Sequence, residues 1–311
     1  MNTPSGSTRL IDPSVRFFGE AAIRRILRYE DLIPSVERAL IDFSSGKVVQ
    51  PVRGILPVEQ HQGFFGVMPA VYGDVFGAKL VTLFPLNAGS ELPTHQGIIV
   101  IFRAATGEPI AVLDGRFITE MRTAAVSAVA TKWLAKKDAS ILGILGSGVQ
   151  ARAHIQALGL VRHFSEVRIW SRSTAHAQEL AKEIGGVATS AEAAVRHADV
   201  VVTVTHASEP VLRGEWLKPG ALVCAVGAVG TRNRELDTAA MQGAVVVDSR
   251  EAAQVESGEI LLAGAKVYAE LGEVLGGKIP IPSANTIVFK SLGLAVEDLA
   301  AAKLVLELSG F

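Results

Sequence analysis

The second half of the chain repeats one pattern, a short apolar run followed by a segment whose apolar residues have helical spacing. Such runs are typical of strands buried on both faces of a sheet. The runs occupy residues 141–145, 167–170, 200–205, 221–226 and 245–248. Helical patterns separate some of them, for example at 175–184 and 190–196. This alternation predicts an α/β fold with a parallel, doubly wound sheet.

The first 120 residues show a different, mixed pattern, which predicts an α+β domain. One helical segment is expected at 33–44, and turns rich in Gly, Pro and Asn divide the remainder into strands. The expected strands lie at 64–71, 78–84, 97–103 and 110–113. A helix of small residues should connect the two halves over 123–137, and we expect a final helix at 293–307 to pack back on the first domain.

The strand at 141–145 runs directly into Gly146-Ser147-Gly148-Val149-Gln150-Ala151, a G-x-G-x-x-A turn that opens a helix. The first glycine permits the tight turn, the second lets a pyrophosphate approach the backbone, and the alanine allows close helix packing. The free N–H groups of the helix then attract phosphate. This strand–turn–helix–strand context predicts a dinucleotide-binding, Rossmann-type domain, whereas a merely tight turn is the alternative.

The residues after the next strand indicate which dinucleotide binds. NAD-specific sites usually place an acid there to bind the ribose 2′-hydroxyl. This chain has Ser171-Arg172-Ser173 instead. An arginine between two hydroxyls can bind a 2′-phosphate, which a carboxylate would repel. We therefore predict NADPH, with NADH as the other candidate. The alternative for Arg172 is a solvated surface side chain.

Composition narrows the function classes and the compartment. The net charge is −1, and no basic block indicates nucleic-acid binding. The first residues contain no apolar segment of a signal peptide, and no apolar run is long enough for a membrane span. The single cysteine, Cys224, lies in the strand at 221–226 and is expected to be a buried core thiol. We expect a cytoplasmic protein that binds neither membrane nor nucleic acid.

Two groups of residues are candidates for binding or chemistry. Thr205, His206 and Val226 end strands of the second half, where ligands of parallel sheets bind. A loop histidine without function is the alternative for His206. In the first half, Lys79 lies on an apolar strand, so it either reaches solvent or faces a polar cavity. If Lys79 converged with Arg53 and Arg122, the three cations would form a carboxylate site with a proton donor.

These residues also carry a family resemblance over residues 35–307. The chain resembles the ornithine cyclodeaminase/mu-crystallin family, and within it the mu-crystallin, NADPH-dependent ketimine reductase branch. The motifs that carry the resemblance are QPVRGILPV, GVMPA, AKLVT, PTHQG, RTAAVSAVAT, ILGSGVQA, VRIWSRS, ESGE and FKSLGLAVEDLAAAKL. The resemblance implies a homodimer in which residues 1–120 with 290–311 provide the substrate site and dimer interface. It also implies a Rossmann domain at 121–289.

Carried over position by position, the resemblance implies individual roles. Arg53, Lys79 and Arg122 match the family's substrate-carboxylate and catalytic cations, and Glu256 matches a ligand-pocket position. No metal is implied. The positions that match cofactor contacts are His95, Arg122, Thr123, Gly146, Ser147, Gly148, Val149, Gln150, Ser171, Arg172, Ser173, Thr205, His206, Val226 and Ser291.

One departure from the family bears on the reaction. Cyclodeaminases follow the strand ending AVG with G-D-x-P-G-K, whose aspartate takes part in proton transfer, but here Val229 stands at that position. Valine cannot accept a proton. The resemblance therefore implies NADPH-dependent reduction of small, cyclic α-imino acids such as Δ1-pyrroline-2-carboxylate or Δ1-piperideine-2-carboxylate. Two alternatives stay open: ornithine cyclodeaminase or a related amino-acid dehydrogenase, and a non-catalytic, NADPH-regulated crystallin-like binding protein.

Overall fold

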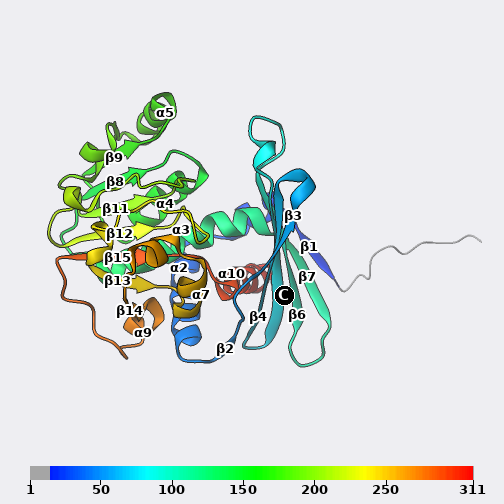
Figure 1. Cartoon of the computed structure of the whole chain (residues 1–311). Coiled ribbons are helices and arrows are strands. Elements are labelled where there is room, and N and C mark those ends of the chain that lie inside the picture. Colours follow the sequence, from blue (N-terminus) through cyan, green and yellow to red (C-terminus); the bar gives the residue numbers. More distant parts are fainter. Residues whose placement is uncertain (1–14, 311) are drawn as a thin grey trace, which may run out of the picture.

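The computed structural model describes residues 15–310, which form two β-sheets joined by a long central helix (Figure 1). The first sheet has the order β1-β7-β6-β5-β4-β2, with β3 also paired to β4. All of its pairings are antiparallel except β1 with β7. Its strands are β1 (Arg16–Phe18), β2 (Val48–Val49), β3 (Gly54–Val58), β4 (Gly63–Tyr72), β5 (Val75–Leu83), β6 (His95–Arg103) and β7 (Pro109–Asp114).

The second sheet is wholly parallel, with the order β10-β9-β8-β11-β12-β15-β13-β14 over the described residues. This confirms the predicted Rossmann-type α/β fold. Its strands are β8 (Ile141–Leu145), β9 (Glu166–Trp170), β10 (Val187–Ala188), β11 (Val200–Thr203), β12 (Ala221–Ala225), β13 (Ala244–Val247), β14 (Val267–Glu270) and β15 (Thr286–Lys290). Its helices are α4 (Val149–Gly159), α5 (Thr174–Ile184), α6 (Ala191–Val195), α7 (Arg250–Glu256), α8 (Gly258–Ala263) and α9 (Leu271–Leu275). Of these elements, the sequence analysis did not predict α7, α8, α9, β10, β14 or β15.

The connecting helix, α3 (Gly115–Leu134), begins earlier than the predicted residue 123 and ends before residue 137. The Asp114 side chain fixes its start, because its carboxylate accepts a hydrogen bond of 2.8 Å from the Phe117 N–H. The helix is buried around almost its whole circumference, which its small side chains permit. It therefore forms a rigid axis between the two sheets.

One face of the first sheet is covered by helices α1 (Glu20–Ile26), α2 (Tyr29–Ser44) and α10 (Ala295–Leu308), together with α3. Helix α10 packs against β4, β5, β6 and α2, as predicted for the final helix, although it starts at Ala295 and not 293. It is reached directly from β15, so the chain crosses from the second sheet back to the first over residues 291–294 (Figure 1). Single 3₁₀ turns lie at Glu59–His61, Pro85–Asn87, Gly214–Trp216 and Ala240–Gln242.

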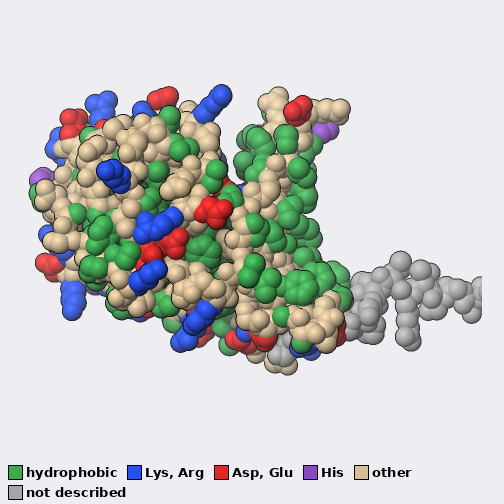
Figure 2. Space-filling view, turned by 60° about the horizontal axis from the view of Figure 1, so that its bottom comes forward, with side chains coloured by type: hydrophobic (Ala, Val, Ile, Leu, Met, Phe, Trp, Pro, Cys, Tyr) green, Lys and Arg blue, Asp and Glu red, His purple; other side chains and the backbone are tan. Residues whose placement is uncertain are grey.

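The opposite face of the first sheet is open and largely apolar. Phe17, Leu56, Val71 and Ile98 are exposed there, and Figure 2 shows hydrophobic side chains gathered over this part of the molecule. A groove of about 550 Å³ on the same sheet is lined by Phe65, Leu80, Thr82, Pro93, Gln96, Gly97, Ile98, Asp114 and Arg116. Exposed apolar area of this extent usually marks a binding surface.

Two smaller expectations can be checked over residues 15–310. Cys224 lies in β12 and is fully buried, and burial raises the pKa of its thiol to about 12. It is therefore the inert core thiol that was predicted. In the same part of the chain, no helix combines the length and the apolar character needed to cross a membrane.

Candidate active site

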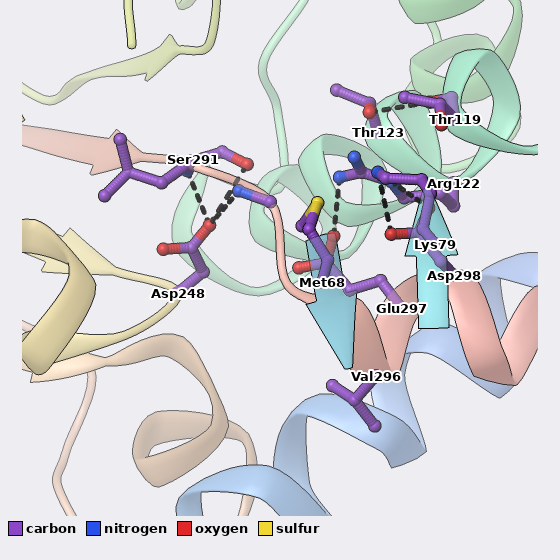
Figure 3. Close-up of polar contacts among 12 residues, drawn as sticks. Met68, Lys79, Thr119, Arg122, Thr123, Asp248, Ser291, Val296, Glu297 and Asp298 are labelled. Carbon is purple, nitrogen blue, oxygen red and sulfur yellow. Dashed lines mark hydrogen bonds and ion pairs between the residues drawn. The ribbon is translucent and has the colours of Figure 1, made fainter. Parts of the chain in front are cut away.

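Lys79 points into the protein and not toward solvent. It occupies the middle of β5, between Met68 of β4 and Ile99 of β6, and only 2% of it is exposed. Helix α10 covers this side of the sheet, and Asp298 of α10 accepts the lysine: the Nζ–Oδ2 distance is 2.8 Å (Figure 3). The alternation of β5 allowed either orientation, and the covering helix decides between them.

Arg122 joins the same cluster from α3. Its Nε donates to Asp298 Oδ1 at 3.1 Å, and its Nη1 donates to Glu297 Oε2 at 2.7 Å (Figure 3). Gly293 passes directly beside the guanidinium: it has φ +82°, and a Cβ built on it would lie 2.5 Å from Arg122 Nη1. Only glycine meets both conditions, because other residues rarely adopt that φ and any side chain would strike the arginine.

Glu297 and Asp298 were missed by the sequence analysis, although both are fully buried. Two acids in the first turn of a helix are favourable beside its positive end and look like ordinary surface residues. The signal that could have found them is that α10 is apolar on all sides, so that its acids cannot reach water. Buried acids require buried cations, and Lys79 and Arg122 are those cations.

The cluster shifts the pKa values of its members in opposite directions. Burial and the Arg122 charge lower the pKa of Lys79 to about 8. Burial alone would raise the pKa of Asp298, but the charges of Arg122 and Lys79 outweigh it and hold that pKa below its usual value. Burial raises the pKa of Glu297 to about 7 despite Arg122. The site thus contains two groups that change protonation near neutral pH, a property typical of active sites.

Arg53 lies on the loop between β2 and β3 and reaches across to the second sheet's side of the molecule. Its Nε is 2.9 Å from Glu256 Oε2, at the end of α7. Its Nη2 donates to the carbonyl oxygens of Leu292 and Gly293 at 2.7 and 2.8 Å. Arg53 and Arg122 therefore both lie against Gly293, so the three predicted cations do converge. The Arg53 charge also contributes to the lowered pKa of Lys79.

The crossing segment has a third anchor in the second sheet. Asp248, just after β13, is fully buried and accepts hydrogen bonds from the N–H groups of Leu292 and Gly293 at 2.6 and 2.7 Å (Figure 3). The Ser291 hydroxyl donates to the same carboxylate at 3.4 Å. Ser291, one of the predicted cofactor contacts, is itself buried and lies at the carboxyl end of β15.

His95 and Thr123 stand close to the cations. His95 is the first residue of β6, and burial with the charges of Lys79 and Arg122 lowers its pKa to about 4. It is therefore neutral at physiological pH. Thr123 follows Arg122 on α3 and donates its hydroxyl proton to the Thr119 carbonyl at 2.7 Å.

The predicted dinucleotide turn has the geometry that a pyrophosphate needs. Gly146 has φ +133°, and a Cβ there would lie 2.8 Å from the Val204 carbonyl oxygen. A Cβ at Gly148 would meet nothing within 4 Å, so the backbone is open to a ligand at that point. Helix α4 starts at Val149 without a side-chain cap, leaving its first N–H groups free for phosphate. Gln150 Oε1 is buried and has no hydrogen-bond partner among the described residues.

The predicted 2′-phosphate residues lie beside this turn. The Ser147 hydroxyl donates to the Ser171 hydroxyl at 2.9 Å, which joins the turn to the end of β9. Ser173 caps α5 by accepting from the His176 N–H at 3.4 Å. The Arg172 side chain is exposed, which fits both the predicted phosphate contact and the alternative of a solvated surface residue.

Thr205, Val226 and His206 follow the strands β11 and β12 at the same sheet edge. A buried glutamate that the sequence analysis missed, Glu235, fixes this edge. It accepts from the Thr205 N–H and hydroxyl at 2.6 Å each and from the Gly227 N–H at 2.7 Å. His206 is exposed and, of the three, lies farthest into solvent.

The predicted cofactor residues thus form a row along one edge of the second sheet. In sheet order, Ser171 follows β9, Gly146 follows β8, Thr205 follows β11, Val226 follows β12 and Ser291 follows β15. The carboxyl ends of parallel strands meet at one edge, and ligands bind there. The row ends beside Arg122 and Lys79. A dinucleotide bound along it would place its far end at the buried cations.

Comparison with known proteins identifies this arrangement. The model of the ornithine cyclodeaminase/mu-crystallin family matches residues 17–309. The ketimine reductase mu-crystallin of Rattus norvegicus is 50% identical over 283 residues, covering 88% of this chain and 90% of the rat protein. A Δ1-pyrroline-2-carboxylate reductase of Bacillus cereus is 36% identical over 304 residues, covering 91% of this chain and 93% of the relative.

Solved structures of related enzymes have the same fold as this chain. The Δ1-pyrroline-2-carboxylate reductase of Thermococcus litoralis, solved with NADH and L-proline, has a TM-score of 0.89 and 35% identity, covering 94% of this chain and 97% of that one. An archaeal alanine dehydrogenase dimer with bound NAD has the same TM-score at 32% identity, covering 95% and 96%. The fold thus defines an α/β protein of the Rossmann class. The chain belongs to the ornithine cyclodeaminase/mu-crystallin family.

Proposed function

We propose that this protein is an NADPH-dependent reductase of small α-imino acids, acting on cyclic ketimines such as Δ1-pyrroline-2-carboxylate or Δ1-piperideine-2-carboxylate. The observation that carries this proposal is the row of strand ends that leads to a buried lysine flanked by two arginines. The names of its relatives, ketimine reductase and Δ1-pyrroline-2-carboxylate reductase, support the same reaction.

Each residue of the cluster has its own role in substrate binding or proton transfer. Arg122 and Arg53 bind the substrate carboxylate, because a guanidinium offers paired donors of the right geometry. NADPH, when bound, supplies the hydride to the C=N carbon. Lys79 supplies a proton at the nitrogen, and its pKa of about 8 suits an acid that works near neutral pH. Glu256 lines the pocket and is the partner that Arg53 exchanges for the substrate.

Cofactor choice follows from the other end of the row. Ser171, Arg172 and Ser173 surround the place of a ribose 2′-substituent and include no carboxylate that would repel a phosphate. The remaining cofactor contacts proposed are His95, Thr123, the Gly146–Gln150 turn, Thr205, His206, Val226 and Ser291.

A spectrophotometric screen tests the reaction. NADPH oxidation is followed with cyclic and linear imino acids, and ornithine with NAD⁺ is run in parallel as the cyclodeaminase control. Turnover of a cyclic ketimine well above all other substrates supports the proposal. If ornithine were converted to proline faster than any ketimine is reduced, the protein would be a cyclodeaminase. NADPH binding without turnover of any substrate would make it a binding protein.

We also propose that the chain is a cytoplasmic homodimer that associates through residues 1–120, with the domain division 1–120 plus 290–311 and 121–289. The exposed Val71 and Ile98 and the groove of about 550 Å³ on the open sheet face support such a contact. Light scattering at micromolar concentration should give twice the 32.8 kDa chain mass. Ile98→Lys should favour the monomer, and a wild-type monomer would contradict the proposal.

A further inference from the structure

The buried cluster has no surplus of positive charge before any ligand arrives. Lys79 and Arg122 are matched by Glu297 and Asp298, and Arg53 is matched by Glu256. Asp248 is compensated by the N–H groups of the crossing segment. A substrate carboxylate beside Arg122 therefore adds one uncompensated negative charge next to side chains that are almost fully buried, which is costly.

The four carboxylates differ in how firmly their charge is held. Asp298 contacts two cations, Lys79 at 2.8 Å and Arg122 at 3.1 Å. Glu297 contacts Arg122 through Oε2, whereas its Oε1 is buried and has no partner among the described residues. A proton is accommodated most easily on an oxygen that gives up no ion pair to receive it. Glu297 is thus the carboxylate that gains a proton most easily. It also contacts Arg122, the arginine proposed to bind the substrate.

We propose that Glu297 takes up a proton when an anionic substrate binds beside Arg122, so that substrate binding is coupled to proton uptake. This inference rests on the proposed function, since it requires a carboxylate at Arg122. The proton restores the charge balance, and it frees the Arg122 guanidinium from one of its two anionic partners to face the ligand. Glu297 acts through Arg122 and is a positioning residue.

Few other titratable side chains near Glu297 could take up the proton. From α3 it faces Arg122, from the end of β13 Asp248, and on its own helix Asp298. Lys79 on β5 and His95 on β6 border the cluster. Strand β4 contributes Met68 without a charge, and α2 packs with an apolar face. Burial already raises the pKa of Glu297 to about 7, so a nearby anion that raises this pKa well above neutral leaves the carboxyl almost fully protonated at pH 7.

Calorimetry measures the coupling directly. Pyrrole-2-carboxylate is a suitable probe, since it is a flat ring carboxylate without a basic nitrogen. It is titrated into the NADP⁺-bound protein at pH 7 in buffers of different ionisation enthalpy, which gives the number of protons taken up. With a free-state pKa of about 7 for Glu297, wild type should take up about half a proton. L-proline carries its own positive charge and should cause little uptake.

Two variants separate Glu297 from other groups. Glu297→Gln should bind pyrrole-2-carboxylate with an uptake of about 0.1 proton or less, the share that Lys79 can supply at this pH. Its Kd should change about twofold between pH 6 and pH 8, against about twentyfold for wild type, in which Glu297 adds about a factor of ten. Glu120→Gln is the matched control: it removes a half-buried acid of raised pKa outside the cluster and should behave like wild type.

Each result distinguishes the coupling from the proposed function. Tight binding of the probe without proton uptake by wild type overturns the coupling alone. If Glu297→Gln takes up as many protons as wild type, the proton binds to another group and the proposal is wrong. If L-proline causes the same uptake as the probe, uptake does not depend on added negative charge and the proposal is also wrong. Failure of both ring carboxylates to bind overturns the proposed substrate site itself. Infrared difference spectra give a check that needs no variant, because a protonated carboxyl has its own carbonyl band, which should grow when the probe binds.

Discussion

Replacing Lys79 by methionine tests the proposed proton transfer most directly. Methionine keeps the length of the side chain and removes the ammonium group in a place where only 2% of the residue is exposed. Asp298 loses its 2.8 Å partner but keeps Arg122 at 3.1 Å. The full penalty of about 3–5 kcal/mol for an orphaned buried charge is therefore an upper limit on the loss of stability.

The effect on catalysis should be larger than the effect on binding. A positioned general acid is worth about 10²–10⁴-fold in rate, so Lys79→Met should lower kcat for ketimine reduction by about 10²-fold or more. This corresponds to roughly 3 kcal/mol or more of transition-state stabilisation. NADPH affinity should hardly change. In wild type, kcat/KM should fall above pH 8, because the pKa of Lys79 is about 8 and the protonated form is the donor.

The assay is steady-state NADPH oxidation over pH 6–9 for both proteins, with Arg53→Met as a control. That variant removes a carboxylate contact and should act mainly through KM. Thermal unfolding confirms that Lys79→Met is folded at the assay temperature. If Lys79→Met keeps a near-wild-type kcat and the same decline above pH 8, the lysine donates no proton and the reasoning is refuted.

Three further predictions follow from other parts of the structure. Arg172→Ala should weaken NADPH binding by about 10–150-fold and leave NADH binding unchanged, measured by cofactor fluorescence; equal losses for both would remove its phosphate role. Ornithine turnover should be at least about 10²-fold slower than ketimine reduction, because Val229 offers no proton acceptor; proline formation measures it. Burial lowers the pKa of His154 from 6.5 to about 4. Between pH 6.5 and pH 4, the unfolded chain therefore binds a proton at this residue and the folded chain does not. The free energy of unfolding should thus fall by up to about 3 kcal/mol as pH drops from 6.5 to 4, and urea titrations of wild type and His154→Gln should differ in this slope.

The parts of the fold that could be predicted from sequence are those whose signal is local. The turn from Gly146 to Ala151 is set by neighbouring residues, and its strand and helix lie directly beside it. The parallel sheet follows from alternating strands and helices in the same way. The predicted first residue of a helix was less accurate where a single side chain fixes the helix start, as Asp114 does for α3.

The site could be predicted only in part because its contacts are distant in sequence. The alternation of β5 placed Lys79 and Leu80 on opposite faces without saying which face is covered. The answer lies in α10, more than two hundred residues later, through Asp298. Glu235 was missed for a similar reason, since it lies in a loop and is buried only because two strand ends close over it.

The order in which these residues are synthesised has a consequence for the nascent chain. Lys79 and Arg122 are made early, but Glu297 and Asp298, their counter-ions, belong to the last described helix. Until that helix leaves the ribosome, the first sheet cannot close over the charges of Lys79 and Arg122 without a large penalty. A product that stops short of α10 would therefore stay open to proteases, because the ion pairs form only after α10 has been made.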